Sequence, residues 1–186
     1  MSIYLGWIGY DDEPVSLLDR VSATIAEQLD EVPRRWRVDE RPRGALDERR
    51  GQHASRAILA WLAERVPAPG ARLLAVTDVD LFIPVLTFVF GEAQLNGDAA
   101  VVSTARLHPP SARLVDRLRK ESVHELAHTF GLVHCTSHTC VMARSPSVAA
   151  VDVKSARLCA DCQVRYREVT KEHRHATGYA ANPDRR

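Results

Sequence analysis

Short apolar runs alternate with segments of helical periodicity along the first half of the chain. Residues 3–10 form a β-prone apolar run, and the continuous run at 72–77 is typical of a buried central strand. Apolar residues recur every three or four positions over 14–31 and 46–66, which predicts two amphipathic helices. A weaker strand is predicted at 36–40.

The segment that follows predicts a β-hairpin. Strands are expected at 88–95 and 99–107, with Asn96-Gly97 between them. An Asn-Gly pair favours a tight turn in which both residues take positive φ. The order of these elements predicts an α/β (α+β) fold: a mixed twisted sheet, mostly parallel, with two packing helices and an antiparallel edge strand at about 88–94.

A third helix is predicted from Ser111, as its N-cap, to about Phe130. At about 100° per residue, His124 and His128 lie roughly opposite the apolar stripe of this helix, which consists of Val115, Leu118, Leu126 and Phe130. One face should therefore pack on the core while the two histidines point away from it. The neighbouring charges Arg119 and Lys120 are interpreted as solvated.

The rest of the chain predicts a small second subdomain. Residues 132–152 are rich in turn formers, and 154–172 predict a last helix. We expect one domain over 1–176, made of a sheet-and-helix subdomain over 1–131 and a C-terminal subdomain over 132–176. A flexible polar tail is expected over 177–186.

Composition and charge exclude several classes of protein. The 186 residues are 45% hydrophobic and 26% charged, which is ordinary for a globular domain. Lys and Arg total 25 against 24 Asp and Glu, so the net charge of +1 argues against a nucleic-acid or anionic-membrane binder. Neither a long apolar run nor a secretion signal is present. We expect a monomeric cytoplasmic protein with no nucleic-acid or membrane partner.

The sequence of the third helix contains a metal-binding motif, His124-Glu125-Leu126-Ala127-His128. Residues four apart lie one above the other on a helix, so both imidazoles can reach one metal ion. Glu125 is rotated to the side of that metal, where a general base for a metal-bound water belongs.

The continuation of the motif supplies a third candidate ligand. Gly131 follows His128 by three residues, and His134 follows Gly131 by three. A glycine with positive φ can end the helix and reverse the chain, which would bring His134 to the same metal. Three neutral imidazoles leave a fourth zinc position open for water, as in catalytic zinc sites.

The four cysteines, Cys135, Cys140, Cys159 and Cys162, form two short-spaced pairs joined by a loop. This spacing is typical of a structural zinc site closed by four thiolates. Two disulfides or a redox pair are the alternatives, although an intracellular chain disfavours disulfides. His138 could replace one cysteine as a ligand. Because Cys135 directly follows His134, a zinc at the cysteines would preorganise the histidine site.

Taken together, these residues resemble the archaemetzincins, a branch of the metzincin zinc metallopeptidases. The family pattern is H-E-x-x-H-x-x-G-x-x-H-C-x4-C-x-M with a downstream C-x-x-C, and this chain matches every element with His124, Glu125, His128, Gly131, His134, Cys135, Cys140, Met142, Cys159 and Cys162. Upstream stretches at 77–81, 88–91 and 100–103 are also similar. The resemblance covers about 70–165.

The resemblance implies a metzincin-like fold with an active-site helix and a small zinc-bearing C-terminal subdomain. It implies two zinc ions, one catalytic on the three histidines and one structural on the four cysteines. It also implies a methionine turn at Met142 beneath the catalytic metal.

The expected activity is peptide-bond hydrolysis by a zinc-bound water with Glu125 as general base. A peptide or protein substrate would pair with the edge strand near 88–93. The alternatives are a zinc hydrolase with narrow or non-peptide amide substrates, and a latent two-zinc binding module.

Overall fold

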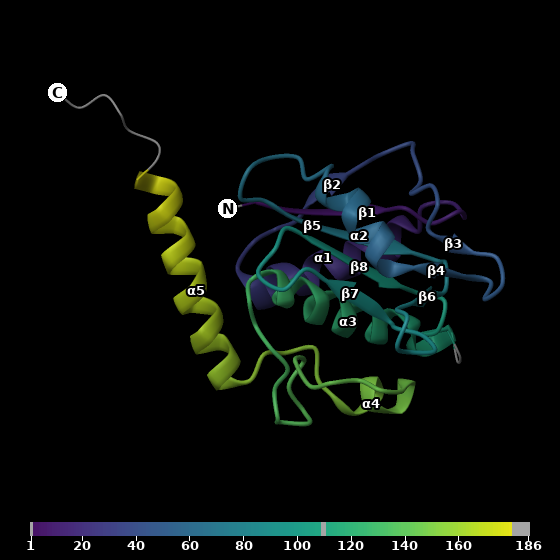
Figure 1. Ribbon diagram of the computed structural model, residues 1–186. Coiled ribbons are helices and arrows are strands. Elements are labelled where there is room, and N and C mark those ends of the chain that lie inside the picture. Colours follow the sequence, from purple (N-terminus) through teal and green to yellow (C-terminus); the bar gives the residue numbers. More distant parts are fainter. Residues whose placement is uncertain (1, 109–110, 180–186) are drawn as a thin grey trace.

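The computed structural model describes residues 2–108 and 111–179 and contains a five-stranded sheet (Figure 1). Its strands lie in the order β2-β1-β5-β8-β7, where β1 is Ile3–Trp7, β2 Arg34–Trp36, β5 Arg72–Thr77, β7 Gly91–Ala93 and β8 Ala99–Ser103. Strands β2, β1, β5 and β8 are parallel, and β7 runs antiparallel at the edge. The predicted mixed sheet with an antiparallel edge strand is confirmed.

Helices cover both faces of this sheet. Every residue of β5 is buried, and its side chains alternate between two cores because successive residues of a strand point to opposite faces. Leu74 and Val76 belong to the core formed with α1 (Val15–Leu29) and α3 (Leu114–Thr129). Leu73 and Ala75 belong to the core formed with α2 (Ser55–Ala63).

The predicted helix over 46–66 is wrong in its first half. A hairpin of β3 (Leu46–Asp47) and β4 (Gln52–Ala54) precedes α2 and joins β6 (Leu81–Phe82) in a second, three-stranded sheet. Asp47 stabilises the turn, because its carboxylate accepts the N–H of Arg49 at 3.0 Å. Gly51 takes a φ of +63°, which continues no helix. Strand β2 also lies two residues earlier than predicted, at 34–36.

The β7–β8 hairpin forms as predicted, but its turn differs. Asn96 has a φ of +55° whereas Gly97 does not have a positive φ. The loop is longer than a two-residue turn, because β7 ends at Ala93 and β8 begins at Ala99. Gly97 is needed for space, since a Cβ there would lie 2.5 Å from the Cβ of Gln94. The N–H of Asn96 donates to the carbonyl of His128 at 2.9 Å, which joins the loop to the end of α3.

Helix α3 begins after a 3-10 turn, η1 (Ser111–Arg113), and its N-cap is Arg113 rather than the predicted Ser111. The expected solvated face is absent, because nearly all of residues 117–127 are buried. The interpretation of Lys120 as a solvated charge is wrong: the residue is 6% exposed. Its Nζ lies 2.7 Å from the Asp116 carboxylate and donates to the Val151 carbonyl at 3.2 Å.

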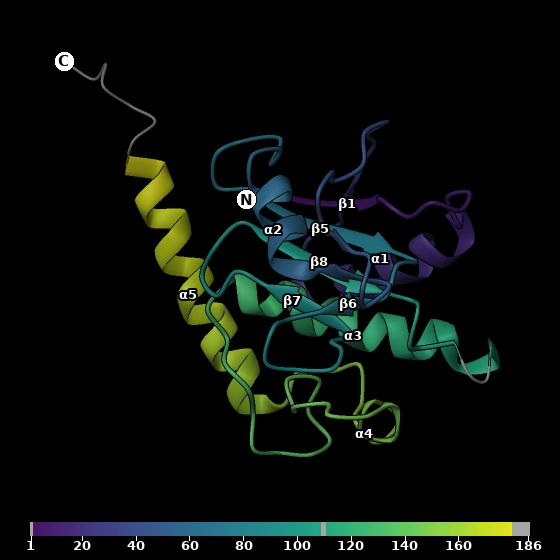
Figure 2. The same cartoon turned by 45° about the vertical axis from the view of Figure 1, so that its right-hand side comes forward.

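The C-terminal part contains two helices where one was predicted. The short helix α4 (Val148–Val153) falls partly within the turn-rich region, and α5 (Ala160–Tyr179) starts six residues later than predicted. Figures 1 and 2 show α5 at one side of the molecule, where Tyr166 donates to the Leu29 carbonyl at 2.8 Å. Of the tail expected over 177–186, the first three residues belong to α5 and the others lie outside the described residues.

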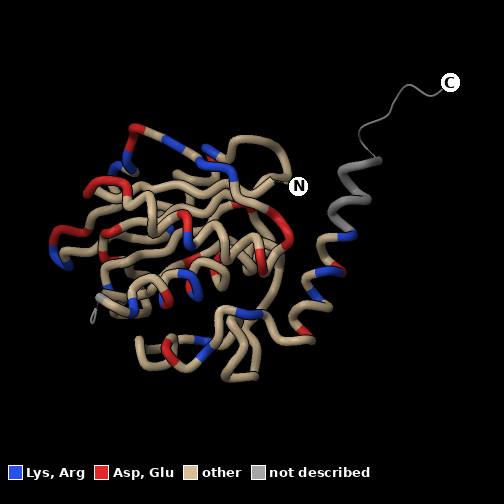
Figure 3. Tube along the Cα trace, turned by 180° about the vertical axis from the view of Figure 1, so that it is seen from behind, with Lys and Arg blue, Asp and Glu red and all other residues tan. Residues whose placement is uncertain are grey.

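Lys and Arg positions alternate with Asp and Glu positions along the Cα trace (Figure 3). Within the described residues, no helix is long and apolar enough to cross a membrane.

An ion pair between Arg117 and Asp152 fastens α4 to α3. Arg117, 3% exposed, donates through Nε and Nη2 to the two carboxylate oxygens of Asp152 at 2.7 and 2.8 Å. It also donates to the carbonyl of Leu107 at 2.9 Å. The hydrogen bonds from Arg117 lower the pKa of Asp152.

We predict that Asp152→Asn lowers the free energy of unfolding by about 2 kcal/mol at pH 7, because it removes a charged hydrogen-bonded pair. A carboxylate with a depressed folded pKa contributes stability above its unfolded value of about 3.9 and loses it as the pH falls through the folded value. The deficit of the variant should therefore shrink below about pH 4, measured by urea unfolding. Asp19→Asn, at an exposed position, is the control. A deficit of the same size at pH 7 and pH 3 would contradict this assignment.

Candidate metal centres and their cleft

Helix α3 places His124 and His128 side by side, with their Nε2 atoms 3.1 Å apart. The Nδ1 of His124 lies 2.8 Å from the Val141 carbonyl, and the Nδ1 of His128 lies 2.6 Å from the Leu132 carbonyl. A carbonyl oxygen only accepts, so each Nδ1 carries the hydrogen. The Nε2 lone pairs therefore converge, as in a metal site whose imidazoles are oriented by backbone acceptors.

Gly131 ends α3 and brings in the third histidine, as predicted. Its φ is +85°, and its N–H donates to the His128 carbonyl at 2.9 Å. The chain reverses and stacks the His134 ring on His124, with ring centroids 5.3 Å apart. The ligand atoms of these residues, called here the histidine group, all lie within 4.8 Å of one another.

The histidine group fits a zinc ion in chemistry as well as in position. Burial is the largest cause that lowers the pKa of all three imidazoles, and the positive charge of Lys154 lowers each further. Neutral imidazole is the form that binds metal. Three imidazole nitrogens are the ligand set of catalytic zinc sites that keep one position for water or substrate.

Glu125 lies beside the histidine group and packs against the edge strand β7. The residue is 7% exposed, and burial together with the neighbouring Glu121 raises the pKa of its carboxyl group well above the usual value. A metal cation on the histidines would instead lower the pKa of the Glu125 carboxyl group. The close approach depends on Gly91, where a Cβ would lie 2.6 Å from the Cγ of Glu125.

The four cysteines also converge, with their sulfur atoms within 4.8 Å of one another. We call these residues, Cys135, Cys140, Cys159 and Cys162, the cysteine group. All four are free, and the Sγ atoms of Cys135 and Cys159 are 3.8 Å apart, much more than the roughly 2.05 Å of a disulfide. His138 is exposed and does not belong to this group.

Backbone N–H groups point at the sulfur atoms of the cysteine group. Ser137 donates to the Sγ of Cys135, and Met142 and Cys159 donate to the Sγ of Cys140, each at 3.4 Å. Such hydrogen bonds favour thiolates, but burial outweighs them at Cys140 and raises the pKa of Cys140 and of Cys162. A backbone hydrogen bond from Cys162 lowers the pKa of Cys159. Four cysteine sulfur atoms this close together are the ligand set of a structural zinc ion.

One short segment, residues 140–143, connects the two groups. The N–H of Cys135 donates to the Met142 carbonyl at 2.9 Å, and the neighbouring Val141 carbonyl accepts from His124. Met142 is 0% exposed and lies in the main core. The same stretch of backbone therefore contacts a member of each group.

A cleft of about 690 Å³ opens over the histidine group. Its walls come from β7 and the preceding loop on one side and from residues 144–146 on the other. Its rim carries exposed apolar side chains, among them Val85, Leu86, Leu95 and Val133.

The edge strand presents backbone groups to this cleft. The Phe90 carbonyl and the Gln94 N–H bond to β8, at 2.7 and 3.0 Å. In an antiparallel ladder the alternate residues point the other way, so the N–H and carbonyl groups of Gly91 and Ala93 face outward. An extended peptide could pair with them.

Sequence analysis missed the buried polar residues of α3 that precede the histidine group, and the lysine that pairs with one of them. Arg117, Lys120 and Glu121 precede His124 by seven, four and three residues, which places them on the same helix face. That spacing was a usable signal for a buried polar face. Lys154 contacts Glu121 although the two residues are thirty-three positions apart in the sequence, and no sequence pattern indicated this contact.

Comparisons with known proteins agree with this geometry. A family model described as Peptidase family M54 matches residues 37–168. An archaemetzincin of Methanopyrus kandleri is 42% identical over 148 residues, which cover 79% of this chain and 84% of that protein.

Solved structures extend the similarity to the fold. The crystal structure of archaemetzincin from Methanopyrus kandleri has a TM-score of 0.80 and 38% identity, covering 92% of this chain and 96% of that one. A zinc-dependent peptidase from Methanocorpusculum labreanum has a TM-score of 0.79 and 28% identity, covering 89% and 100%. The chain therefore belongs to peptidase family M54, the archaemetzincins, and is a zinc metallopeptidase.

Proposed function

We propose that the protein hydrolyses peptide bonds at a zinc ion held by His124, His128 and His134, with Glu125 as the general base. The observation that carries this proposal is the convergence of the three imidazoles beneath a cleft that Glu125 also lines. When bound, zinc supplies Lewis acidity, which lowers the pKa of water and polarises a carbonyl. The Glu125 carboxylate accepts the proton of the attacking water and delivers it to the departing amine.

We infer that the substrate is an extended peptide paired with β7. The outward backbone groups of Gly91 and Ala93 would hold its main chain beside the histidine group. The apolar rim of the cleft favours apolar side chains near the cleaved bond.

A second zinc ion at the cysteine group would have a structural role. Four thiolates leave no ligand position for chemistry. Because Cys135 adjoins His134 and bonds to Met142, a zinc ion there would hold both segments that frame the histidine group.

We further propose that residues 1–176 act as one domain, with the cleft between the subdomains 1–131 and 132–176. Cleft residues from both parts, and a main core that includes both, support this division. We propose a monomer in the cytoplasm, a reducing compartment that agrees with four free cysteines.

Glu125→Gln should lower kcat by about 10²–10⁴-fold while zinc stays bound, because the amide fills the same space but accepts no proton. The measurements are turnover of a mixed peptide library and zinc content by mass spectrometry. Glu48→Gln, at an exposed position, is the control. Turnover retained in Glu125→Gln would exclude Glu125 as the base.

Gly91→Ala should reduce kcat by about 10²-fold with little change in zinc content. The added Cβ would lie 2.6 Å both from the Glu125 Cγ and from the Val101 carbonyl oxygen, so the Glu125 side chain and the edge strand must both shift. Ala99→Gly, on the paired strand β8 and outside the cleft lining, controls for altered sheet stability. Equal losses in both variants would show that the sheet, and not the position of the base, is responsible.

Wild-type protein should contain about two zinc ions per chain, and Cys159→Ser should contain about one. The variant should also unfold at a lower temperature than the wild type, because metal binding and folding are coupled. His138→Ala lies between two of the cysteines and should keep both ions. Zinc loss in His138→Ala as large as in Cys159→Ser would instead identify His138 as a ligand.

A further inference from the structure

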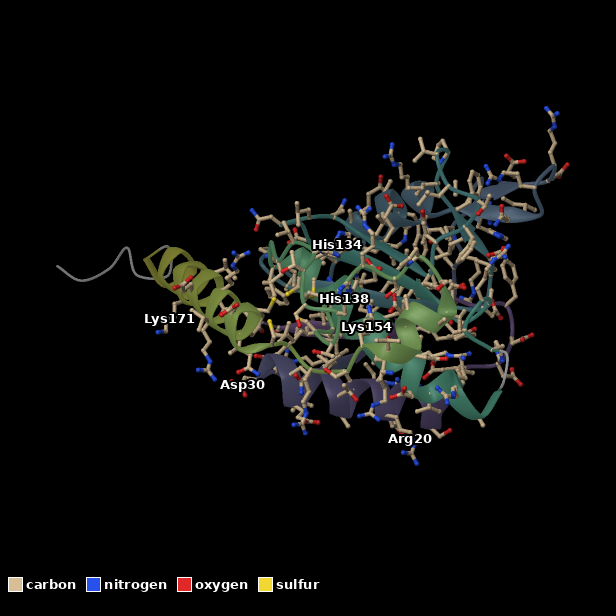
Figure 4. All side chains as sticks on the ribbon, turned by 90° about the horizontal axis from the view of Figure 1, so that it is seen from below. Arg20, Asp30, His134, His138, Lys154 and Lys171 are labelled. Carbon is tan, nitrogen blue, oxygen red and sulfur yellow. The ribbon has the colours of Figure 1, made fainter. Side chains whose placement is uncertain are left out.

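Lys154 is a buried cation that the proposed mechanism does not use. Its side chain is 0% exposed, and its Nζ lies 2.8 Å from the Oε1 of Glu121, itself 3% exposed. The same Nζ donates to the Ala143 carbonyl at 3.3 Å and lies 3.4 Å from the Nδ1 of His124. Figure 4, seen from below, labels Lys154 beside the light-green helix α4.

Stability alone gives no reason for this ion pair. Burying two charges costs solvation, and apolar replacements of both partners are often neutral or stabilising. A lysine and a glutamate held here, with the Ser145 hydroxyl donating to Glu121 at 3.4 Å, indicate a constraint on geometry.

The three neighbours of the ammonium group come from the walls of the metal site. Glu121 lies on α3 one turn before His124, and Ala143 follows the segment whose Val141 carbonyl accepts the His124 Nδ1 hydrogen at 2.8 Å. That hydrogen is already donated, so Lys154 approaches the ring as a neighbouring charge and not as a hydrogen-bond donor. The ammonium group therefore joins α3 to the segment that orients the first zinc ligand.

We propose that Lys154 is a positioning residue for the histidine site: by binding Glu121 and the Ala143 carbonyl together, it sets the separation of α3 from residues 141–143. This separation keeps the His124 Nδ1 on the Val141 carbonyl and its Nε2 directed at the metal. The inference rests on the proposed zinc site at the histidine group.

Lys120 provides a matched control on the same helix. It is also buried, also pairs with a carboxylate, Asp116, and also donates to backbone carbonyls, those of Val151 and Asp152. None of these partners orients a histidine of the group. Lys120→Met thus removes a buried lysine whose hydrogen bonds go to Asp116 and to α4, and not to Glu121 or the Ala143 carbonyl.

The experiment compares Lys154→Met, the double variant Glu121→Met with Lys154→Met, and Lys120→Met in the full-length zinc-loaded protein. Zinc affinity of the histidine group is measured by competition with a chromophoric chelator, with His128→Ala to identify that zinc. Thermal unfolding reports stability, and thiolate-to-cobalt absorption after cobalt substitution reports the cysteine group. Peptide turnover gives kcat.

Lys154→Met alone should be destabilised, because Glu121 is left buried without its partner. The double variant should recover stability yet bind zinc at the histidines about 10–100-fold more weakly, with a lower kcat, as is usual when a supporting partner of a ligand is lost. Lys120→Met should lose stability but keep wild-type zinc affinity, and the cobalt spectrum should stay unchanged in every variant.

A stable double variant with wild-type zinc affinity and kcat would overturn the proposal, as would an equal loss of affinity in Lys120→Met. A failure of the proposed zinc site is distinguishable, because it shows in a protein that keeps Lys154: His128→Ala alone would then leave the zinc content unchanged.

Discussion

The architecture of this protein depends on a helix that is buried on two sides. One side of α3 packs on the sheet through residues such as Leu118 and Leu126, and the other side lies under the C-terminal segment. A helix face with arginine, lysine, glutamate and histidine side chains can be buried only if each charge finds a partner. The C-terminal segment supplies those partners, chiefly Asp152, Lys154 and two backbone carbonyls of α4.

The segment 141–143 bonds to both groups of candidate metal ligands and to the buried lysine. The Val141 carbonyl orients His124, the Met142 carbonyl accepts from Cys135, and the Ala143 carbonyl accepts from Lys154. Three consecutive residues thereby hold a histidine of the histidine group, a cysteine of the cysteine group and a buried lysine. A displacement of this segment would move hydrogen-bond partners of both the histidine group and the cysteine group. The positions of the two groups therefore depend on the same stretch of backbone.

Prediction from sequence succeeded where the information is local. The spacing of His124, His128 and Gly131 is a property of one helix and its end. The continuous apolar run of β5 likewise indicates a buried strand without reference to other parts of the chain. It failed where a neighbour distant in sequence decides the outcome. Periodicity over 46–66 predicted one helix, but Asp47 and Gly51 form a turn that a second sheet stabilises. Lys120 resembled a solvated charge because the backbone carbonyls that accept from it belong to α4, more than thirty positions later.

The sequence alone determined the identity and spacing of the seven candidate ligands and the glutamate beside them. It also determined the alternation of strands and helices, because periodicity and turn-forming residues act over a few positions. The tertiary structure alone decided that the ligand atoms converge, that Gly91 makes room for Glu125, and that Lys154 lies against Glu121. These are contacts between segments far apart in the chain, and their geometry follows from packing and from the cost of leaving a buried polar group without a partner.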